Sequence, residues 1–108
     1  MSDDRFSDPN LLILTSLASG AKHGYAIMDD VETLSGVRLG PGTLYGALAR
    51  LEERGLIEPA PEADEQTGLR KRRPYRLTGR GSAFLREELE RLAYLANAGL
   101  QRLEPGAA

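Results

Sequence analysis

The chain has 108 residues, a length that suits a single domain with one core. Hydrophobic residues make up 41% and charged residues 28%, and cysteine is absent, so a disulfide framework and a thiolate metal site are excluded. The longest aliphatic run, Leu11-Leu12-Ile13-Leu14, is too short to cross a bilayer. Asp3 and Asp4 stand where a secretory signal would carry positive charge, so we expect a cytoplasmic protein.

The charge is distributed unevenly along the chain. The formal net charge of −2 weakly disfavours nucleic acid as a partner. However, the segment from Gln66 to Arg86 contains no acidic residue and seven basic ones: Arg70, Lys71, Arg72, Arg73, Arg76, Arg80 and Arg86. Screening confines the effect of each charge to roughly 8–10 Å, so this tract can act as a local cationic surface.

A first helix is predicted from Asp8, whose carboxylate can cap free backbone amides, and Pro9, which suits the first helical position. The segment Ser19-Gly20-Ala21-Lys22 ends it. Apolar residues lie on more than one side of this helix: Leu11, Leu12, Leu14, Leu17 and Ala18. We therefore expect it to contact both its own core and a further surface.

A second helix is predicted to start at His23-Gly24-Tyr25. Its inward stripe consists of Ile27, Met28, Val31 and Leu34. We expect Tyr25 to belong to the core. The single histidine, His23, is expected to be a capping or packing residue rather than a ligand.

The third helix is the most informative element of the sequence. Gly40 occupies its cap position, Pro41 its first helical position, and Gly55 its left-handed stop. Its predicted inward face consists of Leu44, Ala47, Leu48 and Leu51, which an ordinary amphipathic helix explains. Its outward face near the start is small, hydroxylic and aromatic, and consists of Gly42, Thr43, Tyr45 and Gly46.

This outward face predicts contact with a DNA major groove. Small residues permit close approach, the hydroxyl groups of Thr43 and Tyr45 can donate to phosphate oxygens, and a helix start favours anions. Further along the helix, Arg50 is expected to reach the DNA backbone and Arg54 to pair with a nearby acid. Contacts from Lys22 and Arg38 are left open.

A two-stranded hairpin is predicted after the third helix. Leu56-Ile57-Glu58-Pro59 forms its first strand, residues 61–68 a polar loop, and residues 69–77 its second strand. Three helices followed by a hairpin indicate a winged helix, a mainly α fold with a small β-hairpin. In the wing, Lys71, Arg72 and Arg73 are expected to contact phosphates or the minor groove.

A long last helix is predicted from its cap, Thr78, to about Leu103. Apolar residues recur at spacings of four and three, as in a heptad seam: Leu85, Leu89, Leu92, Ala96, Gly99 and Leu103. A helix this long cannot bury the seam against three short helices, so we expect a homodimer. Residues 1–78 would then form the winged-helix domain, and residues 79–108 the dimerisation helix with a short tail.

Four motifs in this order resemble the PadR family of transcriptional regulators, of the short type with one C-terminal helix. They are His23-Gly24-Tyr25, Gly40-Pro41-Gly42-Thr43-Leu44-Tyr45, the run from Leu48 to Ile57, and Tyr75-Arg76-Leu77-Thr78 after a basic run. The resemblance covers roughly residues 10 to 85.

The resemblance implies a homodimeric repressor that binds a palindromic operator. It also implies that the first and last helices build the dimer, which adds Leu11 and Leu12 to the expected interface. Many members carry proline after Tyr45, where this chain has Gly46; glycine lowers helix stability by about 0.5–1 kcal/mol relative to alanine. Some members bind flat aromatic drugs between paired tryptophans, but this chain has no tryptophan.

Two rival hypotheses remain. One is a winged-helix protein–protein interaction module without specific DNA binding, which the acidic net charge favours and the basic tract opposes. The other is an enzyme or small-molecule carrier, but a catalytic constellation is missing, and we expect neither a cofactor nor a metal. An effector ligand between the last helices, near Tyr94, Asn97 or Leu100, is a hypothesis from geometry alone.

Overall fold

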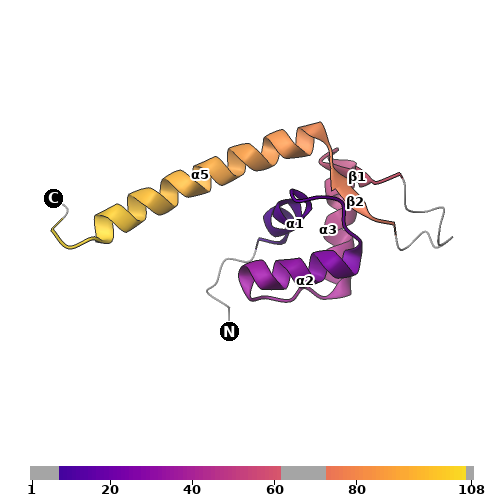
Figure 1. Cartoon of the computed structure of the whole chain (residues 1–108), viewed down its shortest axis with the longest axis horizontal. Helices are drawn as coiled ribbons and strands as arrows, with labels where there is room; N and C mark the ends of the chain where they lie inside the picture. The colour runs from indigo at the N-terminus through magenta and orange to yellow at the C-terminus, as the bar shows by residue number, and fades with distance from the viewer. Residues whose placement is uncertain (1–7, 62–72, 107–108) are drawn as a thin grey trace.

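The computed structural model describes residues 8–61 and 73–106 (Figure 1). In chain order its elements are α1 (Pro9–Leu17), α2 (Gly24–Ser35), α3 (Pro41–Glu53), β1 (Ile57–Pro59), β2 (Tyr75–Leu77) and α5 (Gly79–Leu103). Three short helices and a small antiparallel hairpin form a body, from which the last helix projects. The winged-helix class predicted from the sequence is confirmed.

The predicted helix boundaries are confirmed by their caps. The Asp8 carboxylate accepts hydrogen bonds from the backbone N–H groups of Asn10, at 3.0 Å, and Leu11, at 3.4 Å. The Thr78 hydroxyl oxygen accepts the N–H of Gly81 at 2.9 Å, which opens α5. Gly55 has φ of 77°, the left-handed conformation that lets the chain leave α3 and enter β1.

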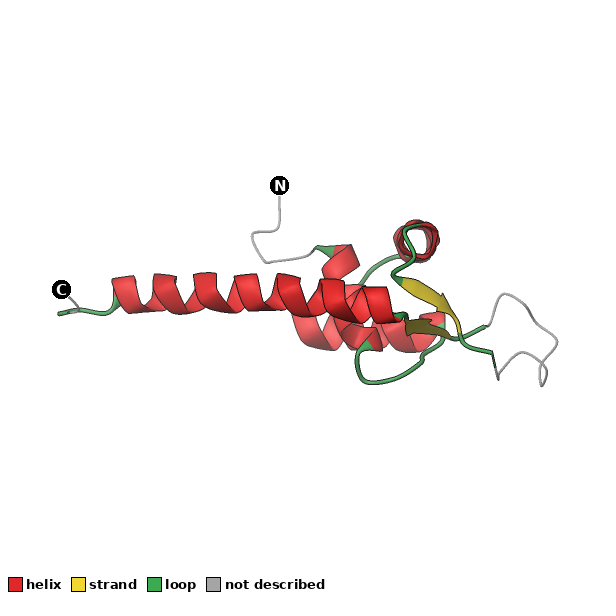
Figure 2. Ribbon diagram, turned by 90° about the horizontal axis from the view of Figure 1, so that it is seen from above, coloured by secondary structure: helices red, strands yellow, loops and turns green. Residues whose placement is uncertain are grey.

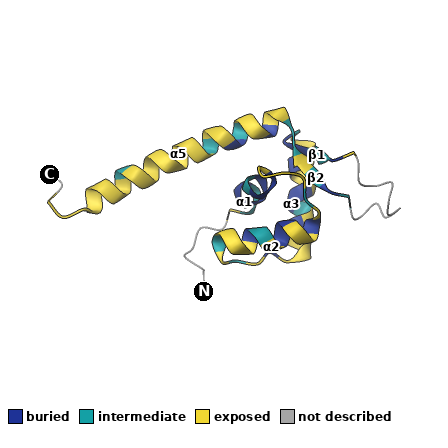
Figure 3. Ribbon diagram, in the orientation of Figure 1, coloured by how far each residue is buried: buried dark blue, intermediate teal, exposed yellow. Residues whose placement is uncertain are grey.

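The core lies where α1 is covered by α2, α3 and the first turns of α5 (Figure 3). All four residues predicted to face inward from α3 are buried, with at most 1% exposure: Leu44, Ala47, Leu48 and Leu51. Helix α1 is buried on nearly every side, so it forms the centre of the body.

The hairpin pairs Ile57 with Leu77, Glu58 with Arg76, and Pro59 with Tyr75. Lys22, in the segment between α1 and α2, extends it: its N–H and C=O both bond to the backbone of Tyr75, at 3.0 and 2.9 Å. The described part of the second strand begins at Tyr75. Positions 69–72 of the strand predicted from the sequence lie outside the described residues.

Two residues of α2 were wrongly predicted to be inside. Tyr25 is 69% exposed because it lies two positions before Ile27, which turns it about 200° away from the buried stripe. Leu34 is 49% exposed because the last turn of α2 extends past the core, where Gly36 ends the helix with φ of 79°.

Helix α5 leaves the body after its first turns (Figures 1 and 2). Leu85 is 4% exposed and belongs to the core, whereas Leu89 and Leu92 are each 38% exposed and Leu103 is 80% exposed. With 25 residues, α5 is about 37 Å long at 1.5 Å per residue. Even so, the helices in the part of the chain that the structure describes lack the apolar length needed to cross a membrane.

Candidate nucleic-acid interface

The structure brings five of the predicted DNA-contacting residues together on the outward face of α3. Gly42, Thr43, Tyr45 and Arg50 are exposed, and Gly46 is half-buried. They face away from the core because Leu44, Ala47 and Leu48 anchor the opposite side of the helix. We call this surface the α3 face.

The two glycines of the α3 face are not required by the protein's own packing. Neither has a positive φ. A Cβ atom added to Gly42 would meet no heavy atom within 4 Å, and one added to Gly46 would meet only Nη1 of Arg50, at 3.6 Å. Because these two positions have no side chain, another molecule can approach the backbone of α3 closely there.

Tyr45 connects the α3 face to the start of α2. Its side chain is packed so closely on Gly24 that a Cβ atom there would lie 2.3 Å from the Tyr45 hydroxyl oxygen. The residue is still 42% exposed. His23, at the cap position of α2, is exposed, and its side chain makes no capping hydrogen bond. The Gly24–Tyr45 contact was not predicted from the sequence, because Gly24 and Tyr45 belong to different helices.

Several basic side chains of the body are held by neighbours. The ammonium group of Lys22 donates to the carbonyl oxygen of Ser16 and, at 2.7 Å, to the Ser19 hydroxyl. It therefore interacts with the C-terminal end of α1. Arg76 bonds to Glu58 across the hairpin at 2.9 Å. The charged groups of Lys22 and Arg76 are therefore already hydrogen-bonded within the body.

Arg38 and Arg54 are also engaged. Arg38 donates to Glu32 at 2.8 Å and to Asp29 at 2.9 Å, and these hydrogen bonds raise the pKa of its guanidinium. Arg54 was predicted to pair with an acid, but its guanidinium lies 5.3 Å from the centre of the Phe84 ring. That prediction was wrong because α5 crosses the end of α3 and presents an aromatic face there.

Arg50 forms no ion pair within the described residues. Its guanidinium lies over Gly46, one turn nearer the start of α3. The α3 face thus carries a positive charge that no acid of the described chain neutralises.

After the loop the described chain resumes at Arg73, two positions before β2 begins. Arg73 is half-buried there, whereas Lys71 and Arg72 lie outside the described residues. Burial raises the pKa of the Tyr75 hydroxyl; the charge of Glu52 raises it further, and Arg73 lowers it. Tyr45 also raises the pKa of Tyr75, which places the phenol of β2 within the electrostatic reach of α3.

The fold is a winged helix, its third helix can be approached closely, and Arg50 on that helix has no ion pair within the described residues. These features are typical of the winged-helix transcription regulators. The model of the PadR-like family of transcriptional regulators matches residues 13–87. The chain therefore belongs to the PadR-like family of transcriptional regulators.

Solved structures agree with this assignment. A PadR family transcription regulator from Clostridium difficile R20291 is 29% identical, with a TM-score of 0.73, over 88% of this chain and 97% of that chain. A transcriptional regulator from Clostridium thermocellum is 26% identical, with a TM-score of 0.67, over 88% of this chain and 89% of that one. A PadR-like regulator from Bacillus cereus, at 21% identity, shares the fold with a TM-score of 0.73 over 88% and 90% of the two chains.

A relative in sequence is an uncharacterized 37.1 kDa protein in transposon TN4556 of Streptomyces fradiae. It is 43% identical over 101 residues, which are 94% of this chain. The chain spans 28% of that relative's length.

Proposed function

We propose that the protein is a cytoplasmic transcriptional repressor that binds an inverted-repeat operator as a two-fold homodimer. The first turns of α3 enter the major groove, and Lys71, Arg72 and Arg73 of the wing contact the flanking backbone. Residues 1–78 bind DNA and residues 79–108 form the dimer.

The observation that carries this proposal is the α3 face. Gly42 and Gly46 leave its surface low although no internal contact requires glycine there. Thr43 and Tyr45 place exposed hydroxyl groups beside them, and Arg50 adds a charge unpaired within the described chain. A surface without protruding side chains, with hydrogen-bond donors and a positive charge, is suited to contact the bases and phosphates of a nucleic-acid groove.

The homodimer is supported by the exposed seam of α5, which consists of Leu89, Leu92, Ala96, Gly99 and Leu103. An apolar stripe on a projecting helix calls for a partner surface. Leu85, Leu11 and Leu12, which are 4%, 8% and 8% exposed, would lie at the base of the interface. Two-fold symmetry places the two α3 helices on half-sites about one helical turn, or a multiple of it, apart.

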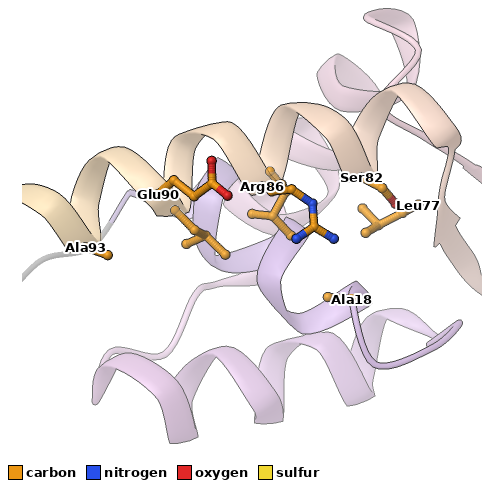
Figure 4. Close-up of a pocket in the computed structure, with 8 residues that line it drawn as sticks. Ala18, Leu77, Ser82, Arg86, Glu90 and Ala93 are labelled. Atoms are coloured by element: carbon orange, nitrogen blue, oxygen red, sulfur yellow. The ribbon is translucent and has the colours of Figure 1, made fainter.

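A groove beside the seam adds to this support. It has a volume of about 430 Å³ and lies between α5 and the end of α1 (Figure 4). Leu85 and Leu89 of the seam line it with Ala18, Leu77 and Ala93, and its polar lining consists of Ser82, Arg86 and Glu90. An apolar side chain from the partner's helix can pack on the two leucines of such a groove. A small-molecule effector near Tyr94, Asn97 or Leu100, which are exposed further along α5, remains part of the proposal.

Salt dependence tests the proposal against the rival protein–protein interaction module. Fluorescent duplexes that cover the region upstream of the protein's own gene are titrated with protein in 50 and 200 mM salt. A dimer with about 6–10 phosphate contacts is expected to lose about 10³–10⁵-fold in affinity between these concentrations. Binding that is absent, or that ignores salt, would favour the rival module.

A further inference from the structure

We infer that Arg50 determines sequence specificity: its guanidinium hydrogen-bonds to the major-groove edge of one guanine in each operator half-site. This inference rests on the proposed function, because it assumes that α3 enters the groove. It assigns Arg50 to a base, where the sequence analysis assigned it to the DNA backbone.

The first argument is that Arg50 has no partner within the described residues, whereas four other basic residues of the body do. Arg38 is bound by two acids of α2, Arg76 by Glu58, and Arg54 by the ring of Phe84. Lys22 is bound by α1. Within the described residues Arg50 has no such partner, so all its donors remain available to a ligand.

The second argument is the path that Gly46 opens. Thr43, Gly46 and Arg50 follow one another at spacings of three and four, so they share one side of α3. Long side chains on a helix lean toward its N-terminus, and here the Arg50 guanidinium lies over Gly46, with Nη1 3.6 Å from the position of an added Cβ atom. A long side chain at position 46 would occupy this path.

The third argument concerns where the guanidinium ends. The guanidinium lies over Gly46, between the Arg50 backbone and the first turn of α3. It is therefore on the α3 face, which the proposed function directs toward the groove floor. Glu53, the acid three residues further on, lies toward the opposite end of the helix. A planar fork at that place matches the two acceptors of guanine, O6 and N7, which an arginine contacts with two parallel hydrogen bonds.

The experiment is selection of binding sites from random duplexes with the full chain and with the variants Arg50→Ala and Arg50→Lys. The unmodified chain is expected to enrich a two-fold motif with a fixed G·C pair in each half. In Arg50→Ala that pair becomes degenerate, and affinity for the best site falls about 5- to 150-fold per half-site contact. Affinity for duplexes already altered at that pair stays within about twofold. Arg50→Lys keeps the charge but loses the fork, so it also loses the base preference.

Arg80→Ala is the matched control, since Arg80 is an exposed arginine at the start of α5 that also lacks an ion pair in the described structure. It is expected to leave every selected position unchanged. If Arg50→Ala instead weakens all sequences equally and lowers the salt slope of the dimer by about two, one for each chain, Arg50 contacts phosphate and the inference is overturned. If the unmodified chain enriches no motif, the proposed function itself fails. Melting curves of the Arg50 and Arg80 variants are expected to match that of the unmodified chain, which checks that the fold is intact.

Discussion

The Tyr45 hydroxyl group packs directly on Gly24: a Cβ atom at Gly24 would lie 2.3 Å from the hydroxyl oxygen and 3.0 Å from Cζ of the ring. This contact joins α3 to the first turn of α2, so two of the sequence motifs that resemble the family touch each other. The Tyr45 ring is thereby oriented while 42% of the residue stays exposed to a ligand.

Gly24→Ala is expected to weaken DNA binding far more than it weakens the fold. The new methyl group must displace the Tyr45 ring, which is half-exposed and can swing outward, so the free energy of unfolding falls by about 1 kcal/mol, the low end of the cost of overpacking. Affinity for DNA falls because the displaced ring lies in the path of the groove. Thermal melts and binding isotherms on the same samples measure the two effects.

A double-mutant cycle with Tyr45→Ala isolates the cause. Once the ring is removed, Gly24→Ala is expected to have no further effect on affinity, because the displaced group is gone. Additive losses in the two variants would show that Gly24 acts independently of Tyr45.

Gly81→Ala is expected to destabilise the protein by at least about 1–3 kcal/mol. An added Cβ atom would lie 1.9 Å from the carbonyl oxygen of Leu56, a backbone atom held by the N–H of Thr78. Gly79→Ala, two positions earlier in the same helix, is the control, since its Cβ atom meets nothing within 4 Å. Chemical denaturation of both variants gives the comparison; equal stability would contradict the tight packing of Gly81 on the backbone of Leu56.

In the proposed homodimer a charge in the α5 seam would have to be buried at two symmetric positions, so Leu92→Asp is expected to yield monomers. The dimer dissociation constant should rise at least about tenfold. Gln101→Asp, nine positions after Leu92 and therefore about 180° around the helix from it, is exposed; it is the control and should leave the dimer intact. Sedimentation equilibrium measures both; an unchanged dimer in Leu92→Asp would place the interface elsewhere.

Tyr75 should ionise at higher pH than an ordinary tyrosine. Burial, followed by the charge of Glu52, raises its pKa above 10.0, so its neutral form is favoured in the folded state. The associated stability is fully present below pH 10.0 and is lost as the pH rises through the higher folded pKa. Near-ultraviolet titration of the four tyrosines should show one late phenolate, absent in Tyr75→Phe. A titration curve identical in both proteins would refute the assignment.

The elements that rest on local chemistry were predictable from the sequence. Asp8, Thr78 and Gly55 determine where helices begin and end, and each acts on backbone groups within a few residues of itself. The inward face of α3 was predictable because a single apolar stripe at helical spacing has only one way to be buried.

Features that depend on distant segments could not be predicted in this way. Arg54 meets Phe84 only because α5 crosses α3, and Gly81 is needed only because the carbonyl of Leu56 lies under it. Leu34 is apolar and correctly spaced, yet its helix extends past the core. In each case the outcome depends on whether another element lies beside the residue. The helical spacing of apolar residues contains no information about that.

The central claim, that a two-fold dimer presents two α3 faces to one operator, is tested most directly by footprinting on the DNA upstream of the protein's own gene. The footprint is combined with a stoichiometric titration of the protected duplex. We expect protection of an inverted repeat whose halves lie one helical turn or a multiple apart, saturating at two chains per site. Protection of a single asymmetric half by one chain, or no protection at any low-salt concentration, would contradict the account.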